Sequence, residues 1–100
     1  MLNNNYQIKT TATFDKWHKN IKDKQTLTRI DIRINRIRKG NFGDHKQIAQ
    51  HLFELRLFFG SGYRIYWTIK NHQIILLLSA GDKKTQKADI KLAKQLLEKL

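Results

Sequence analysis

The sequence predicts a single α+β domain, 1–100, in which helices pack on one face of an antiparallel sheet of about four to five strands. Three observations predict it. Apolar and polar residues alternate between positions 53 and 69, which is typical of strands. Apolar residues recur every three or four positions in the segments 13–40 and 85–100, which is typical of helices. A chain of 100 residues has room for only one hydrophobic core.

The chain begins with a candidate edge strand and a short helix. Residues 6–10 alternate over a short stretch, as an edge strand does. Thr13 stands where a helix cap belongs, because its side-chain oxygen can accept a hydrogen bond from the first helical turn. The apolar positions that follow share one helical face, and we expect this helix to end near Lys22.

A second helix is expected between Asp23, its candidate cap, and Gly40, its C-terminal stop. Apolar residues recur between them at spacings of three, four and three. Ile30, Ile32 and Ile34 also alternate and are β-branched, which favours a strand. A segment of about fourteen residues exceeds the usual strand length, so length favours the helix.

A hairpin with a Gly-Ser-Gly loop is the centre of the predicted sheet. We expect Phe59 to face Tyr63 across this loop. Arg56 then faces Tyr66, and it becomes the diagonal neighbour of Arg64 at roughly 7 to 8 Å. The apolar odd-numbered positions face the core, and the even-numbered positions form a partly open polar face. Both arginines lie on that face, within joint reach of one anion.

Three further elements complete the prediction. Segment 46–50 is a candidate short strand before the hairpin. The run 74–78 is apolar at every position, which suits a strand covered on both sides or an interior strand, and we expect it in the middle of the sheet. Thr85 is the expected cap of a closing helix with a wide apolar stripe.

The charge predicts a polyanionic partner. Twenty Lys and Arg against eight Asp and Glu give a net charge of +12, which favours nucleic acid over a merely soluble basic surface. Arg29, Arg33 and Arg36 recur at helical spacing, and this basic stripe either contacts RNA or is a solvated face.

The composition also excludes some classes of site. Without cysteine there are no disulfides and no thiolate metal sites. The four histidines fall on separate predicted elements, so we expect no metal and no cofactor. The longest apolar run has five residues, whereas a membrane-spanning helix needs about 20. The amino terminus has no apolar signal region, and we expect a cytoplasmic protein without a membrane partner.

Three segments together resemble motifs of the RelE/ParE superfamily of bacterial type II toxins, and most closely its HigB-like (Gp49-like) addiction module killer proteins. They are RINRIRKGNFGDHK (33–46), ELRLFFGSGYRIYW (54–67) and LLLSAGDKKTQKADI (76–90). The similarity extends over nearly the whole chain in the same order. It implies the element order β-α-α-β-β-β-α and a toxin that is neutralised by a cognate antitoxin, often a helix-turn-helix protein.

The resemblance also implies an activity. RelE-like members are mRNA interferases that cleave mRNA in the ribosomal A site and inhibit translation, whereas ParE-like members inhibit DNA gyrase without catalysis. Arg64 matches the hairpin arginine of the family, Arg56 matches less closely, and Lys83 or Lys84 stands where the family has a basic residue after the last strand. Some HigB-like toxins have a histidine near the carboxy terminus. This chain has none after His72, which excludes a histidine base from that region.

The residues suit metal-independent endoribonuclease chemistry. Attack of a 2′-hydroxyl on its phosphate requires stabilisation of negative charge, which arginine supplies through a bidentate fork. A lysine amine can accept the proton where other cations crowd it, and Lys83 is the candidate, with Lys84 as the alternative. Tyr66 either stacks on an RNA base or is a half-exposed sheet tyrosine. A basic RNA-binding module without toxicity is a third possibility.

Two carboxylates are candidates for holding the basic residues in place. Glu54 belongs to the first strand of the hairpin, and Asp82 follows the last strand. Both can accept hydrogen bonds from neighbouring cations. We expect them to orient the site and to take no part in metal binding.

Overall fold

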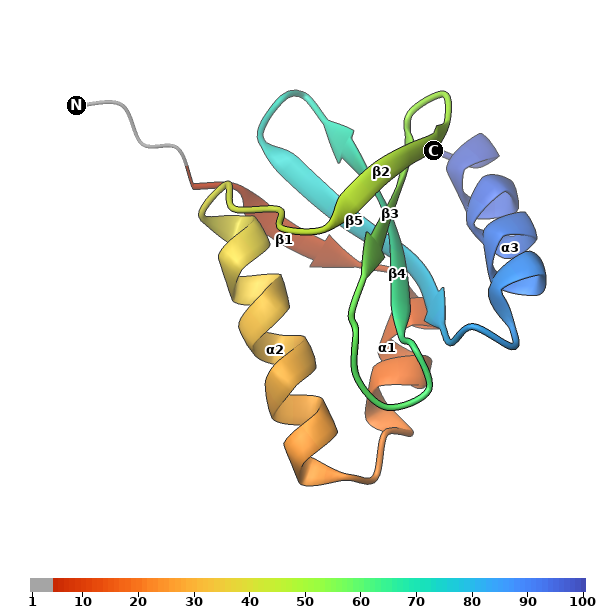
Figure 1. Cartoon of the computed structure of the whole chain (residues 1–100). Coiled ribbons are helices and arrows are strands. Elements are labelled where there is room, and N and C mark those ends of the chain that lie inside the picture. The colour runs from red at the N-terminus through yellow and green to blue at the C-terminus, as the bar shows by residue number, and fades with distance from the viewer. Residues whose placement is uncertain (1–4) are drawn as a thin grey trace.

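The computed structural model describes residues 5–100. The expectation that the amino terminus has no apolar signal region falls partly on residues 1–4, which lie outside the described residues. One five-stranded sheet with the order β1-β5-β4-β3-β2 is covered by three helices (Figure 1). The elements are β1 (Gln7–Thr10), α1 (Ala12–Lys19), α2 (Lys24–Arg38), β2 (His45–Ala49), β3 (Leu52–Arg56), β4 (Arg64–Lys70), β5 (Ile74–Gly81) and α3 (Gln86–Glu98). The predicted α+β fold class is confirmed. Within the described residues, no helix has the length and apolarity required to cross a membrane.

The sheet is mixed, since β1 pairs with β5 in parallel while the other neighbouring pairs are antiparallel. β5 lies between β1 and β4, which confirms the interior position predicted from its apolar run. The parallel pairing was not predicted. A four-residue strand carries too little pattern to choose its neighbour or its direction.

Helix α2 confirms the helical interpretation of the isoleucine-rich segment. Asp23 caps it, accepting a hydrogen bond from the backbone N–H of Thr26 at 3.2 Å. Ile30 and Ile37 are fully buried, whereas Ile32 is 47% exposed. An alternating strand would place Ile30 and Ile32 on one face, but the helical period separates them.

Helix α1 begins two residues earlier than predicted, because Thr11 and not Thr13 is its cap. The Thr11 hydroxyl accepts a hydrogen bond from the Phe14 N–H at 3.1 Å and donates one to the carbonyl of Leu78 at 2.6 Å. One threonine therefore starts the helix and fastens it to β5. The helix ends at Lys19, before the predicted end near Lys22.

The hairpin register differs from the prediction by two residues. Leu57, and not Phe59, pairs with Tyr63, and its N–H donates to the Tyr63 carbonyl at 3.0 Å. The loop between them is longer because Gly60 and Gly62 both have positive φ, at 58° and 76°. A shift of two keeps every side chain on its predicted face. It also places Arg56 directly opposite Arg64 instead of opposite Tyr66.

The even-numbered face is not open over most of its area. Helices α1 and α2 lie on one side of the sheet and α3 on the other (Figure 1). Ala93 of α3 packs in a second buried cluster with Leu52, Tyr66, Leu76 and Leu78. The expectation of helices on one face alone is wrong for α3. The end of this face near Arg56 and Arg64 lies outside that cluster.

Candidate functional site

Arg56 and Arg64 form the centre of the candidate site. They are directly paired across β3 and β4, where facing Cα atoms lie about 4.5 to 5.5 Å apart. Like charges directly opposite each other destabilise a sheet. Two facing guanidinium groups therefore require nearby negative charge, which the protein supplies in part and which a bound anion would complete.

Arg56 is paired with Asp44, which precedes β2. Its Nε lies 3.3 Å from Oδ2 of Asp44, and the two side chains are 33% and 35% exposed. The backbone N–H of Arg56 also donates to the carbonyl of Asp44 at 3.0 Å. This partner was not predicted, because nothing in the turn sequence around Asp44 indicates which strand it meets.

Arg64 is held by a buried polar cluster. Its Nη1 donates to the carbonyl of Gly62 at 3.1 Å. Its Nε is 3.8 Å from Oε2 of Glu54, whose side chain is only 1% exposed. The same oxygen accepts hydrogen bonds from the hydroxyl of Tyr66 at 3.1 Å and from Nε2 of Gln86 at 2.9 Å. Glu54 thus links β3, β4 and α3 beneath the arginine, consistent with the orienting role expected for it.

Two atoms of this cluster have spare hydrogen-bonding capacity. Within the described residues, Oε1 of Glu54 and Nε of Arg64 are buried without a hydrogen-bond partner. A buried, unpaired polar atom costs about 1 to 3 kcal/mol. Because both atoms are buried, this unused capacity lies inside the cluster, and an RNA phosphate would have to meet the terminal nitrogens of the Arg64 guanidinium.

Lys83 lies beside Arg64. The backbone N–H of Lys83 donates to the carbonyl of Ser61 at 3.3 Å, which joins the loop after β5 to the hairpin loop. A Cβ built on Gly62 would lie 3.6 Å from both Nη1 of Arg64 and Cβ of Lys83. The predicted grouping of Arg56, Arg64 and Lys83 at one end of the sheet is therefore present in the structure.

Asp82 shapes the loop that carries the two lysines. Its Oδ1 accepts the backbone N–H of Lys84 at 2.8 Å and that of Thr85 at 3.1 Å. Partial burial raises the pKa of Asp82, but these N–H groups and the hydroxyls of Ser61 and Thr85 outweigh it and lower the pKa below its usual value. Asp82 therefore holds the loop and does not contact the arginines. Lys84 is exposed in this loop.

Thr85 occupies the cap position of α3 without making a side-chain cap bond. Its hydroxyl donates to Oδ2 of Asp89 at 2.5 Å and accepts the backbone N–H of Asp82 at 3.1 Å. Burial raises the pKa of Asp89, against the lowering effect of this hydroxyl. A side chain on Gly81 would overlap Asp89 and Thr85, so the start of α3 approaches β5 through this glycine.

The remaining predicted RNA-binding residues lie elsewhere. Tyr66 is fully buried, so the expectation that it stacks on an RNA base is wrong. Its burial and then the charge of Glu54 raise the pKa of the Tyr66 phenol well above 10.0, so the phenol remains a hydrogen-bond donor at neutral pH. A tyrosine that stacks on an RNA base must be exposed to solvent, whereas helix α3 covers Tyr66.

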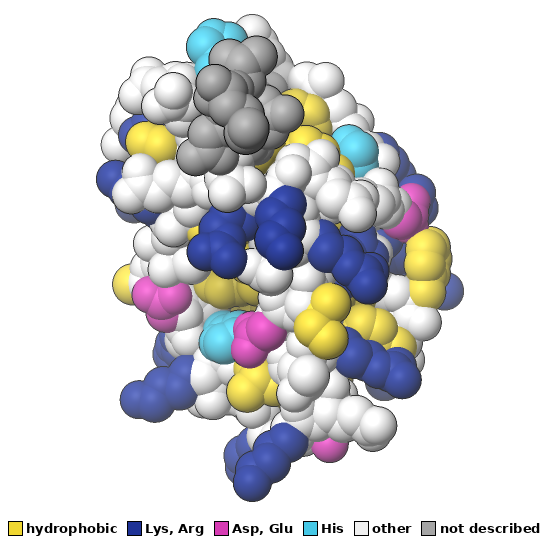
Figure 2. Space-filling view, turned by 90° about the vertical axis from the view of Figure 1, so that its left-hand side faces the viewer, with side chains coloured by type: hydrophobic (Ala, Val, Ile, Leu, Met, Phe, Trp, Pro, Cys, Tyr) yellow, Lys and Arg dark blue, Asp and Glu magenta, His cyan; other side chains and the backbone are white. Residues whose placement is uncertain are grey.

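The arginine stripe is on α2, on the other side of the sheet from α3. Arg33 is not a free cation, because its guanidinium donates to the carbonyls of Arg56 at 3.1 Å and Phe42 at 3.0 Å. Burial and then the neighbouring Arg36 lower the pKa of Arg33. Arg29 and Arg36 are exposed, and Figure 2 shows Lys and Arg side chains distributed over this side of the molecule. The structure therefore does not bring the stripe to Arg64.

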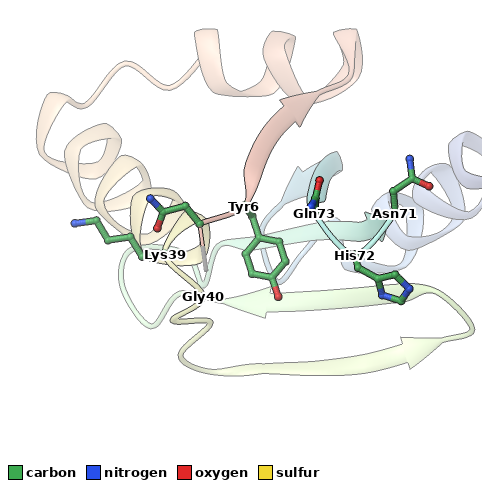
Figure 3. Close-up of a pocket in the computed structure, with 7 residues that line it drawn as sticks. Tyr6, Lys39, Gly40, Asn71, His72 and Gln73 are labelled. Atoms are coloured by element: carbon green, nitrogen blue, oxygen red, sulfur yellow. The ribbon is translucent and has the colours of Figure 1, made fainter. Parts of the chain in front are cut away.

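A cleft of about 690 Å³ lies at the opposite end of the sheet, at the β4–β5 turn. Figure 3 shows the side chains of Tyr6, Lys39 and His72 around it. Among the described residues that line this cleft, Lys39 is the only lysine or arginine. The cleft lies beyond the Lys70 end of β4, whereas Arg64 begins that strand. In the described part of the chain, no group of three His, Asp or Glu residues is placed to hold a metal ion.

Comparison with known proteins gives a family and a fold. Residues 12–98 match the family described as "Phage derived protein Gp49-like (DUF891)", which confirms the resemblance drawn from the three motifs. An uncharacterised protein of Haemophilus influenzae (strain ATCC 51907 / DSM 11121 / KW20 / Rd) is 47% identical over 94 residues, covering 94% of this chain and 95% of that protein.

Two solved structures share the fold. An E. coli toxin RelE double arginine-to-alanine mutant in the free state has a TM-score of 0.66 at 11% identity, covering 87% of this chain and 96% of that one. The toxin–antitoxin complex RelBE2 from Mycobacterium tuberculosis has a TM-score of 0.63 at 15% identity, covering 79% of this chain and 99% of that one. At these identities the likeness shows the fold.

Proposed function

Because the chain belongs to the Gp49-like family, we propose that it is the toxin of a type II toxin–antitoxin system and that it cleaves mRNA on the ribosome. The likeness of its fold to the RelE toxin and to the toxin–antitoxin complex RelBE2 supports this proposal. Its partners are then the ribosome with bound mRNA, and a cognate antitoxin of helix-turn-helix type. The toxin acts in the cytoplasm, where it inhibits translation.

The facing arginines, Arg56 and Arg64, are the observation that carries the proposal. A direct pair of like charges is unfavourable in a sheet unless an anion lies between or above the two groups. Phosphate suits this position because each guanidinium offers parallel donors to two of its oxygens. A protein that only binds another protein has no comparable need for both cations at one sheet end.

The proposed reaction is an intramolecular attack within the RNA. The 2′-oxygen forms a bond to the adjacent phosphorus and its proton passes to the side-chain amine of Lys83, while the bond from phosphorus to the 5′-oxygen breaks and this oxygen takes a proton from water. Arg64 and Arg56 stabilise the negative charge that develops on the phosphoryl oxygens. Lys84, exposed in the same loop, contributes a phosphate contact.

The test is in-vitro translation followed by primer extension on the mRNA. We expect cuts at codon spacing that require ribosomes and appear without added metal. Intact mRNA would contradict the proposal, and intact mRNA together with linearised plasmid in a gyrase assay would replace it with the ParE-like alternative. The same assay on naked mRNA distinguishes ribosome-dependent cleavage from general ribonuclease activity.

A further inference from the structure

A groove of about 270 Å³ runs between α2 and the loop that follows β3. It lies on the side of the sheet opposite α3, and one of its lining residues, Arg33, donates a hydrogen bond to the backbone carbonyl of Arg56. Apolar and cationic side chains line it together. Its lining residues are Arg29, Ile32, Arg33, Arg36, Leu57, Phe58 and Phe59.

The groove collects exposed apolar surface. Phe58 is 80% exposed and Ile32 is 47% exposed. Among the described residues, the only other large exposed hydrophobic side chain is Leu100 at the carboxy terminus, at 56%. Burying a Phe or Ile side chain stabilises an assembly by roughly 1.5 to 3 kcal/mol. Two such side chains in one groove therefore indicate a surface that another molecule covers.

The walls of the groove are already held in place. The guanidinium of Arg29 lies over the ring of Phe59, with Cζ 5.2 Å from the ring centroid. Arg33 fastens α2 to the end of β3 through the carbonyl of Arg56, and to the loop between α2 and β2 through the carbonyl of Phe42. A partner therefore meets a preformed groove and does not have to order it, which favours affinity.

We propose that this groove binds an acidic, amphipathic segment of the antitoxin, a partner that rests on the proposed function above. Apolar side chains of that segment cover Phe58 and Ile32, and its carboxylates meet Arg29 and Arg36 at the rim. A second copy of this chain fits poorly, because each copy carries a net charge of +12 and the same arginines. The side chains of Ile32 and Leu57 in the lining are aliphatic and offer no hydrogen bonds to RNA bases, so a protein segment fits better than RNA.

We expect a neighbouring gene to encode the antitoxin, and titration calorimetry with the protein from that adjacent gene tests the proposal. We expect Phe58→Ala and Ile32→Ala to weaken binding together by about thirty-fold or more, the size of an interface hot spot. Leu100→Ala, which removes exposed apolar surface elsewhere, is the matched control and should change binding by less than about two-fold. Both groove side chains are exposed, so circular dichroism should show an unchanged fold.

Cleavage on ribosomes separates the groove from the active site. We expect the Phe58→Ala, Ile32→Ala chain to cut mRNA at the wild-type rate and to escape neutralisation by the adjacent-gene protein. Unchanged affinity, or no binding by the wild type, would overturn the groove proposal even if the chain cleaves mRNA. A parallel loss of cleavage would also overturn it and assign the groove to the ribosome. Wild-type protein that leaves mRNA intact contradicts the proposed function instead, while calorimetry still decides the groove.

Discussion

Nε of Arg64 lies 3.8 Å from Oε2 of Glu54, a carboxylate whose side chain is 1% exposed. The side chain of Arg64 is itself only 15% exposed. It therefore belongs partly to the protein interior, contrary to what an open sheet face implies. A large truncation at this position disturbs both packing and charge, so the sharpest test of its role keeps the charge.

Arg64→Lys should slow mRNA cleavage by about a hundred- to a thousand-fold, the usual effect of removing one donor to transition-state charge. Lysine preserves a positive charge near Glu54 but cannot reproduce a bidentate fork. The measurement is single-turnover cleavage on programmed ribosomes, with circular dichroism to verify folding. Arg38→Lys, the same exchange at an exposed position of α2, is the control and should cleave normally. A folded Arg64→Lys chain with wild-type rate would remove Arg64 from the active site.

Glu54 and Tyr66 should be energetically coupled. Tyr66→Phe removes the hydroxyl that donates to Glu54, at a cost of about 0.5 to 1.5 kcal/mol in unfolding free energy. Glu54→Ala leaves the Tyr66 hydroxyl buried without its partner, so we expect a larger loss of unfolding free energy than for Tyr66→Phe. In urea unfolding, we expect the double variant to be more stable than the sum of the two losses implies, by at least about 0.5 kcal/mol.

A second cycle controls for this coupling. Thr28 is exposed on α2, where its hydroxyl donates a hydrogen bond within its own helix, to the carbonyl of Lys24. Tyr66→Phe and Thr28→Ala should therefore add within about 0.3 to 0.5 kcal/mol. Equal coupling energies in both cycles would mean that the hydrogen bond between Tyr66 and Glu54 does not couple the two residues.

The sheet faces were predictable from sequence, but the register was not. Alternation assigns Leu55, Leu57 and Ile65 to the buried face whichever residues close the loop, and all three are buried. The closing pair depends on the backbone angles of Gly60 and Gly62, which glycine leaves unspecified. The grouping of the two arginines survived this error, because a shift of two residues moves side chains along a face and not through the sheet.

The face of the sheet that α3 covers was harder to predict from the sequence. An amphipathic helix specifies that one stripe is buried but not against which face of a sheet. The continuous apolar run in β5 was the available signal, since a strand apolar on both sides requires cover on both sides. Tyr66 and Leu76 lie under that cover. Asp44, the partner of Arg56, carried no sequence signal because a turn residue does not specify which strand it meets.

Gly81→Ala should destabilise the protein by roughly 1 to 3 kcal/mol, the usual effect of overfilling a packed contact. The added methyl would overlap the carboxylate of Asp89 and the hydroxyl of Thr85 and push α3 from β5. Thermal and urea unfolding measure the loss. In an Asp89→Ala background the penalty should shrink, because the main obstacle is gone. An equal penalty in both backgrounds would place the strain elsewhere.

Binding to ribosomes or RNA should weaken steeply with salt. If phosphate contacts dominate, the logarithm of affinity falls with the logarithm of salt concentration by about 0.7 to 0.9 per neutralised phosphate. Lys84→Ala should reduce the slope by about one contact without changing cleavage position. A flat salt response would contradict a phosphate-based interface despite the net charge of +12.

Asp82 should contribute stability that disappears in acid. Partial burial raises its pKa, but hydrogen bonds from Thr85 and Lys84 lower it below the ordinary value of 3.8. For a carboxyl with a lowered folded-state pKa, the stabilising contribution is complete above pH 3.8 and is lost as pH falls through the folded-state pKa. Asp82→Asn should therefore reduce the unfolding free energy near neutral pH.

The difference in unfolding free energy between the two proteins should narrow as the pH falls through the folded-state pKa of Asp82, where the wild-type carboxyl also becomes neutral. Urea unfolding at several pH values measures it. Since the Asp82 carboxylate holds the backbone of the loop that carries Lys83, Asp82→Asn should also slow cleavage at neutral pH, in proportion to how far the lysine moves. A stability difference that stays constant from neutral pH to pH 2 would mean that the shape of the side chain matters and its charge does not.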